Sequence, residues 1–246
     1  MIILSKWYKK GDIKRDDFLD PWKKRMVARF TDKMSNKEQP FPCIPATIGF
    51  ALDQLRFGFI GSPTEERTTH ELGELLRNYS KHSRELGKYT SLIVFYEISK
   101  EIIESYSVEQ YEHIFWEQLS KLMVYDKKAW PREIPIDPNH HMWEFSFHGE
   151  RYFMYCATPA HQKRNSRSFP TLMLAITPRW VFQQFNESKH AEKIINQVRN
   201  RLKNYDSIPI HPELKPYGAE DNFEWKQYFL RDNNQISSKC PFHYKK

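Results

Sequence analysis

The sequence is poor in the residues that build phosphate-binding loops. It contains only eight glycines, and neither the G-x-x-x-x-G-K-[ST] nor the G-x-G-x-x-G pattern occurs. Both patterns need glycine to bring backbone amides close to phosphate groups, so nucleotide and dinucleotide sites are not expected. The G-x-S-x-G motif that places the nucleophile of serine hydrolases is also absent, which argues against that reaction class.

Cysteine is scarce as well. The three cysteines, Cys43, Cys156 and Cys240, form no C-x-x-C pair, so neither a zinc ribbon nor covalent haem attachment is indicated. This usage is typical of a reducing compartment. No apolar run approaches the roughly 18 residues that a membrane span needs. The apolar run in the first residues, "MIILSKWYKK", is too short for a signal peptide. We therefore expect a cytoplasmic protein without a membrane partner.

The charge that is present is spread along the chain. Lysine and arginine number 38 against 31 acidic residues, which gives a net charge of +7 and a pI of about 9.1. Because the excess is not gathered into a basic tail or helix, no nucleic-acid partner is expected. Hydrophobic residues make up 39% of the chain and aromatic residues 15%. That is enough for a large core and for flat apolar pocket walls.

The hydrophobic pattern predicts both helices and strands. Helical spacing occurs in residues 15–34, 67–86, 108–123 and 191–202, with Ser107 and Ser188 as N-caps, and 47–55 predicts a short helix. Strands are expected at 55–61, 89–97, 142–149, 151–158 and 171–177, the third and fourth joined by a tight turn at Gly149–Glu150. We predict an α+β fold: a single domain over residues 1–246, with a mixed or largely antiparallel sheet of about five strands flanked by helices.

The hairpin expected at 142–158 leads into a loop that carries a histidine and several basic residues. A non-covalently bound haem needs an axial ligand, an apolar slot and cations for its propionates. His161 is the candidate ligand, Arg164 and Arg167 are the candidate cations, and three aromatic residues are candidate walls, namely Trp143, Phe145 and Phe153. A loop that is simply solvated is the alternative interpretation.

Two other iron sites stay open. His148, Glu150 and His161 would form the two-histidine, one-carboxylate face of non-haem iron if they met on one side of a strand. Cys43 and Cys240 each lie beside proline, in "FPC" and "CPF", and either would be a thiolate ligand in place of His161. The alternative interpretation is that both cysteines are buried structural residues in segments that proline makes rigid.

Several motifs together resemble the YqcI/YcgG family. They are "FPC" and "LRFGF" in the first quarter, then "WEFSFHGERYF" and "TPAHQKRNSRS", and finally "YGAEDNFEWKQY" and "KCPF" near the end. Their order matches the family from about residue 41 to residue 242. In many members a histidine stands directly before a proline in the basic segment, whereas here Thr158 precedes Pro159 and the nearest histidine is His161.

The resemblance implies a haem-dependent monooxygenase that hydroxylates nitrogen or carbon on a small amino acid such as arginine. It implies haem b as the cofactor, a small nitrogen-containing substrate, and a separate electron donor, because the chain has no flavin or nicotinamide motif. A guanidinium substrate needs a carboxylate, for which Glu144 and Glu150 are both candidates. A non-catalytic haem- or anion-binding protein is the alternative implied by the same basic loop.

Overall fold

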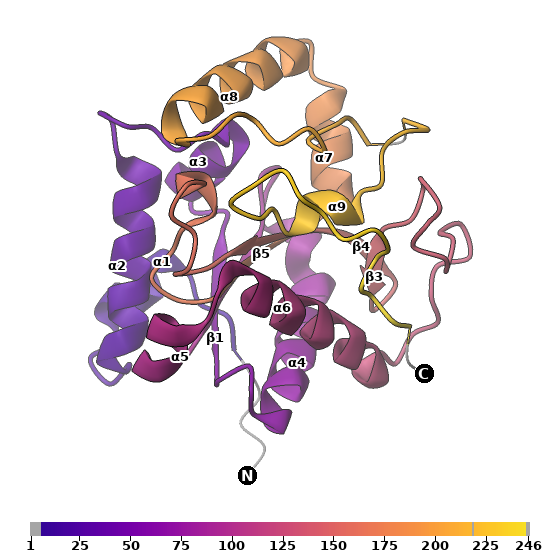
Figure 1. Ribbon diagram of the computed structural model, residues 1–246. Helices are drawn as coiled ribbons and strands as arrows, with labels where there is room; N and C mark the ends of the chain where they lie inside the picture. Colours follow the sequence, from indigo (N-terminus) through magenta and orange to yellow (C-terminus); the bar gives the residue numbers. More distant parts are fainter. Residues whose placement is uncertain (1–5, 218, 245–246) are drawn as a thin grey trace.

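The computed structural model describes residues 6–217 and 219–244, and its centre is one five-stranded sheet (Figure 1). Residues 1–5, which belong to the start considered as a signal peptide, lie outside this range, as does Gly218 of the resemblance motif. The strands are β1 (Arg56–Ile60), β2 (Leu92–Tyr96), β3 (Phe145–Phe147), β4 (Glu150–Ala157) and β5 (Met173–Pro178). Their order is β1-β2-β5-β4-β3, with β1 and β2 parallel and the other neighbours antiparallel, which confirms the predicted α+β fold with a mixed sheet.

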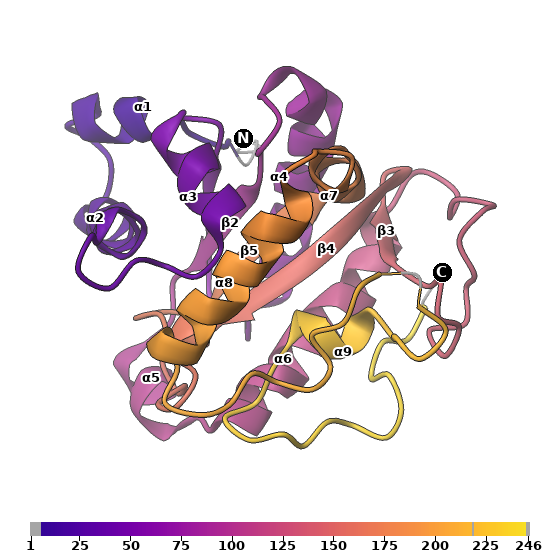
Figure 2. The same cartoon turned by 90° about the horizontal axis from the view of Figure 1, so that it is seen from above.

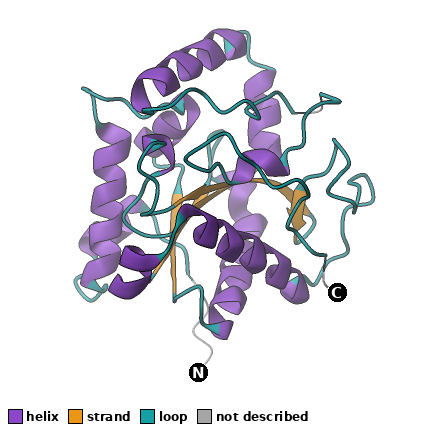
Figure 3. Cartoon of the chain, in the orientation of Figure 1, coloured by secondary structure: helices purple, strands orange, loops and turns teal. Residues whose placement is uncertain are grey.

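Helices surround this sheet (Figures 1 and 3). The α-helices are α1 (Lys10–Arg15), α2 (Pro21–Ser35), α3 (Ile44–Ala51), α4 (Glu66–His82), α5 (Lys100–Ser105), α6 (Val108–Leu122), α7 (Arg179–Asn186), α8 (Ala191–Tyr205) and α9 (Trp225–Tyr228). Short 3-10 turns are η1 (Ser83–Glu85), η2 (Met123–Tyr125) and η3 (Asn165–Arg167). The sequence pattern does not predict α1, α5, α7 and α9, since they are too short to show a clear helical period.

The sheet separates two apolar layers because side chains alternate along each strand. Residues such as Val94, Met154 and Ile176 face the layer that contains α4 and α6. Phe95 and Met173 face the opposite layer, which contains α2 and α3. Figure 2 shows α2 and α3 on one side of the strands, with α6 on the other.

Several helix boundaries differ from the sequence expectation; α3, for example, covers Ile44–Ala51 and not 47–55. The helix expected from residue 15 begins later, because α2 begins at Pro21, whose fixed φ suits a first helical position. Helix α8 begins at Ala191 with His190 as its N-cap residue, and the hydroxyl of Ser188 accepts a hydrogen bond from the backbone amide of His190 at 3.3 Å and does not cap the helix. Ser107 caps α6 as predicted, within a complete capping box.

The turn of the β3–β4 hairpin lies one residue earlier than predicted. Phe147 pairs with Glu150, so the central residues are His148 and Gly149, with φ of 54° and 74°. Two positive φ values define the tight turn whose twist matches antiparallel strands. The histidine of the "HGE" motif therefore lies in the turn itself and not on a strand.

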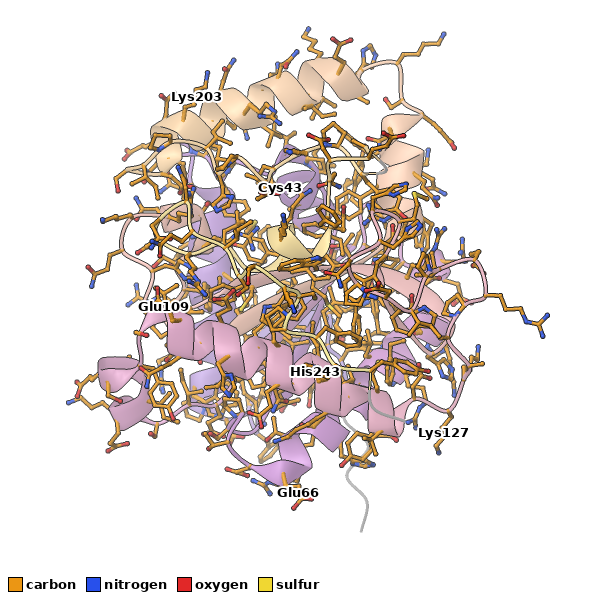
Figure 4. The ribbon with its side chains drawn as sticks, turned by 45° about the vertical axis from the view of Figure 1, so that its right-hand side comes forward. Cys43, Glu66, Glu109, Lys127, Lys203 and His243 are labelled. Atoms are coloured by element: carbon orange, nitrogen blue, oxygen red, sulfur yellow. The ribbon has the colours of Figure 1, made fainter. Side chains whose placement is uncertain are left out.

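The C-terminal segment from residue 206 onward is mostly irregular and crosses the surface of the other elements (Figure 3). Near its end the backbone amide of His243 donates to Ser120 Oγ on α6 at 3.0 Å, and Figure 4 shows His243 beside this helix. Within the described residues no helix combines the length and the apolar character that a membrane crossing needs.

Candidate functional site

The histidine and two of the arginines of the basic loop are buried, whereas Lys163 is exposed. His161, Arg164 and Arg167 retain only 3%, 1% and 5% of their exposed surface. Charged side chains are rarely so buried unless each polar group is paired. The interpretation of a solvated loop is therefore wrong for these three residues, and their partners decide what they do.

His161 makes hydrogen bonds through both ring nitrogens. Nε2 lies 2.8 Å from the carbonyl oxygen of Leu230, and Nδ1 lies 2.8 Å from the hydroxyl of Thr158. A carbonyl only accepts, so Nε2 carries the proton, and in the neutral ring Nδ1 accepts from Thr158. Burial lowers the pKa of His161 to about 4, which keeps the ring neutral at physiological pH.

The two buried arginines donate mainly to backbone carbonyls. Arg167 donates to the carbonyls of Cys156, Gln227 and Tyr228 at 3.3, 2.9 and 2.8 Å. Arg164 donates through Nε to Arg231 at 2.7 Å and through Nη1 to Pro209 at 3.1 Å. Carbonyl oxygens satisfy the guanidinium donors without neutralising the charge.

Asp232 fastens the same loop from the other side. Its carboxylate accepts hydrogen bonds from the backbone amides of Gln162, Lys163 and Arg164, at 2.6, 3.0 and 2.9 Å. These bonds hold the pKa of Asp232 below its usual value, although burial acts in the opposite direction, since hydrogen bonds to the charged form favour it. We call the contact between residues 158–168 and 227–234 the loop clasp, since it joins segments more than 60 positions apart.

In this arrangement the loop clasp offers no free ligand atom to a haem. Neither ring nitrogen of His161 is free to bind iron, and Arg164 and Arg167 turn their donors toward the backbone. Coordination by His161 would replace one of its two hydrogen bonds, so its role as axial ligand stays a prediction. In the described residues no three histidine, cysteine, aspartate or glutamate side chains gather as a metal site. The proposed set of His148, Glu150 and His161 is thus not assembled, because the hairpin turn directs His148 elsewhere.

The alternative thiolate ligands are free thiols. Cys240 is buried, Cys43 is half-buried at the start of α3 (Figure 4), and no disulfide forms between them. Burial raises the pKa of Cys240 to about 12, and it raises the pKa of Cys43 as well. Since the thiolate is the ligand form, both environments favour the structural role.

The three aromatic residues expected to line a pocket pack against protein instead. Trp143 and Phe145 are fully buried, and the ring of Phe242 lies 5.3 and 5.8 Å from theirs. Phe153 lies between the rings of Phe182 and Tyr228, at 5.4 and 5.3 Å. The ring of Phe182 in turn lies 5.3 Å from the guanidinium of Arg179, which belongs to a second polar site.

This second site is a buried guanidinium between two carboxylates, which we call the carboxylate–arginine cluster. Arg179, the first residue of α7, has its Nε 2.6 Å from Glu144 Oε1, and its Nη2 contacts Glu224 Oε1. All three side chains are at most 4% exposed. The Arg179 guanidinium also stacks on the ring of Tyr217, 4.2 Å from its centre, as cations do on aromatic faces.

Glu144 is incompletely satisfied in the cluster. Neither of its oxygens has a well-directed hydrogen bond among the described residues, because the short contact with Arg179 is poorly aligned. Burial raises the pKa of Glu144, and Arg179 and the nearby Tyr217 hydroxyl only partly offset this effect. The three ionised groups carry one net negative charge. Arg151, outside the cluster, also lowers the pKa of Glu144, but the net shift is still upward, so the carboxylate remains short of positive charge.

Sequence reasoning identifies Glu144 but not its partners. Arg179 follows a strand-ending proline, and Glu224 lies in an aromatic-rich tail, so neither has a local pattern of its own. The available signal is a single carboxylate between Trp143 and Phe145, in a segment whose two faces are both buried. Such a residue needs a buried cation, but the sequence does not say which one.

Comparison with known proteins assigns the sequence to a family. The sequence model described as the YqcI/YcgG family matches residues 30–243. The chain is 46% identical over 241 residues to the uncharacterized protein YcgG of Bacillus subtilis (strain 168), covering 97% of this chain and 95% of the relative. It is 44% identical to the uncharacterized protein YqcI of the same organism, with the same coverage.

A more distant relative has a name that specifies a reaction. The putative N(omega)-hydroxy-L-arginine synthase DcsA of Streptomyces lavendulae is 32% identical over 222 residues, which cover 87% of this chain and 82% of the relative. No solved structure matches the chain.

Proposed function

Since the chain belongs to the YqcI/YcgG family, we propose that it hydroxylates a guanidine nitrogen of a small arginine-like substrate. The name of the relative DcsA supports the reaction class. The observation in this chain that carries the proposal is the buried Glu144, whose oxygens lack well-directed partners beside Arg179.

Charge is the physical reason for the choice of a guanidinium substrate. Two carboxylates and one guanidinium leave a negative charge in a buried place, where an unpaired charge is costly. A substrate guanidinium offers planar, forked donors that match a carboxylate such as that of Glu144. Tyr217 shows how the site packs a guanidinium, since its ring already covers the one on Arg179.

We include haem b in the proposal as the group that activates dioxygen. When bound, it would supply a monooxygenation in which one oxygen atom enters the N–OH product and the other leaves as water, with two electrons from a separate donor protein and two protons from solvent. Among this chain's residues, His161 is the proposed ligand. Trp143, Phe145 and Phe153 are the proposed apolar wall, which would require their present ring packing to open. Because the loop clasp occupies both nitrogens of His161, binding would require the bond to Leu230 to open.

The test compares two carboxylates that the sequence left as alternatives. Glu144→Gln removes the buried charge, whereas Glu150→Gln changes a residue whose partner, Arg84, is exposed. Protein from haem-supplied cells is given L-arginine, dioxygen and a reductase, and hydroxyarginine is measured by mass spectrometry. We expect product from the wild type and from Glu150→Gln, and at least tenfold less from Glu144→Gln. Equal turnover by both variants would remove Glu144 from the proposal, and no turnover by folded wild type would overturn the function.

The cofactor has its own test. Titration of the purified protein with hemin should give a visible absorption band that His161→Ala abolishes. A band that survives in His161→Ala but disappears in Cys43→Ala or Cys240→Ala would assign the ligand to sulfur. A protein without affinity for hemin would remove haem and leave only the guanidinium site.

A further inference from the structure

A surface hollow borders the loop clasp, through Pro159 and Ser168, and lies apart from the carboxylate–arginine cluster. It has a volume of about 410 Å³ and lies between the last turns of α2, the segment 159–170 and the end of α8. In Figure 1 α2 forms the left side of the molecule and α8 crosses its top. The hollow is lined by Arg29, Asp32, Lys33, Asn36, Pro159, Ser168, Phe169, Pro170 and Tyr205. None of these residues belongs to the carboxylate–arginine cluster.

Two side chains of opposite charge in the hollow have no ion-pair or hydrogen-bond partner among the described residues. Arg29 and Asp32 stand three positions apart on α2, a spacing that brings side chains close on a helix. They nevertheless form no ion pair with each other, and neither makes a hydrogen bond or ion pair elsewhere in residues 6–217 and 219–244. Both are exposed, so a free guanidinium and a free carboxylate border the same hollow.

The remaining cation is already bound by the protein. Lys33 Nζ donates to the carbonyls of Asn165 and Ser168 at 2.8 and 3.0 Å, and it lies 5.3 Å from the centres of the Phe41 and Tyr205 rings. Lys33 thereby fixes α2 against the loop and keeps the walls of the hollow in place. It leaves Arg29 as the unpaired cation for a ligand.

The floor of the hollow is apolar and rigid. Phe169 is buried and stacks on Phe95 of the central sheet at 5.3 Å, and it also contacts Phe30 of α2. Pro159 and Pro170 also line the hollow, and the proline ring fixes the backbone angle φ at both positions. Small-molecule sites commonly combine such a preformed apolar surface with a few well-placed polar groups.

We propose that this hollow is a binding site for a zwitterionic α-amino acid with an apolar or aromatic side chain. Arg29 binds the ligand carboxylate with forked donors, and Asp32 binds the ligand ammonium. The side chain of the ligand packs on Phe169 and the two prolines. Because the ligand touches both α2 and the segment that continues into the loop clasp, its binding also stabilises the clasp.

The site is tested with L-phenylalanine and two truncated analogues. Phenethylamine lacks the carboxylate and 3-phenylpropanoate lacks the ammonium group, while both keep the ring. Titration calorimetry on the full chain should detect L-phenylalanine, with at least tenfold weaker binding of either analogue. Equal affinity for all three compounds would reduce the site to an apolar contact and overturn the proposal.

Variants at the free charges complete the test. Arg29→Gln and Asp32→Asn should each weaken L-phenylalanine binding at least tenfold without a change in the melting temperature, since neither side chain has a partner to lose. Arg25→Gln, an exposed arginine one turn earlier on α2, is the matched control and should bind as the wild type does. Unchanged binding in both variants, or no binding at millimolar ligand, would refute the site. Turnover of arginine in Glu144→Gln addresses the other site, so the two proposals fail separately.

Discussion

His161 donates from Nε2 to the carbonyl oxygen of Leu230, 2.8 Å away and 69 positions further along the chain. This bond joins the loop after β4 to the segment after α9. It also uses the nitrogen that a metal would need, so the same imidazole cannot close the clasp and bind iron through Nε2 at once. The stability of the clasp and the proposed cofactor chemistry are therefore linked through one side chain.

Removal of this ring should destabilise the folded protein. His161→Ala leaves the Leu230 carbonyl without its donor and opens a cavity, for which we expect a loss of about 2–4 kcal/mol in the free energy of unfolding. Urea denaturation measures it. The control is His113→Ala, which removes an exposed histidine on α6. It should change stability by about 0.5 kcal/mol or less. Equal stability of the two variants would show that the clasp is not closed in solution.

Acid should weaken the fold through its buried histidines. Burial lowers the pKa of His161 and of His211 to about 4, against about 6.5 in the unfolded chain. Between these values the unfolded chain binds protons that the folded protein excludes. The free energy of unfolding should be at its full value above about pH 6.5 and should fall as the pH decreases toward about 4, on the order of 2–3 kcal/mol for each histidine.

His211 offers a clean variant for this pH effect. Its Nδ1 accepts a hydrogen bond from the backbone amide of Glu213 at 3.2 Å. The side-chain oxygen of asparagine can accept the same bond, but asparagine does not titrate. His211→Asn should therefore lose less stability than the wild type between about pH 6.5 and 4. Urea melts at several pH values across this window measure the difference, and parallel curves would contradict the assigned cause.

The carboxylate–arginine cluster should respond strongly to loss of its cation. Arg179→Met leaves Glu144 and Glu224 buried without a counter-ion, and breaking a buried pair in this way costs about 3–5 kcal/mol. The triple variant with Glu144→Gln and Glu224→Gln should recover most of that loss, because no charge is left unpaired. If Arg179→Met unfolds at the urea concentration of the wild type, the cluster is not buried as described.

The hairpin turn predicts a stabilising substitution. His148 has a φ of 54° and Gly149 a φ of 74°. Asparagine adopts this conformation more readily than histidine does, and Asn-Gly is the preferred pair for this turn. His148→Asn should raise the free energy of unfolding by about 0.5–1 kcal/mol, whereas Gly149→Ala should lower it by about 1–2 kcal/mol. Thermal melts of both variants test the sign, and a destabilised His148→Asn would show that the imidazole has a packing role.

The site is less predictable from sequence than the fold. Glu144, His161 and the two arginines of the loop are recognisable as unusual because each interrupts or closely follows an apolar strand. Their partners Arg179, Leu230 and Asp232 are not, because a partner 35 to 70 positions away leaves no mark on local spacing. Helices α1, α5, α7 and α9 are not predicted for a related reason: they are only four to eight residues long, too few to display a clear helical period.

By itself the sequence determined the strands of the sheet, the hairpin between β3 and β4, and the amphipathic helices, because side-chain alternation and helical spacing are local properties. The tertiary structure alone decided that Arg164 and Arg167 are buried and that Arg179 lies between two carboxylates. Burial of a charge depends on whether distant backbone carbonyls and side chains arrive to satisfy it, and that depends on how the whole chain packs. For the same reason the pairs that join Arg167 to Tyr228 and Glu144 to Arg179 exist only in the folded protein.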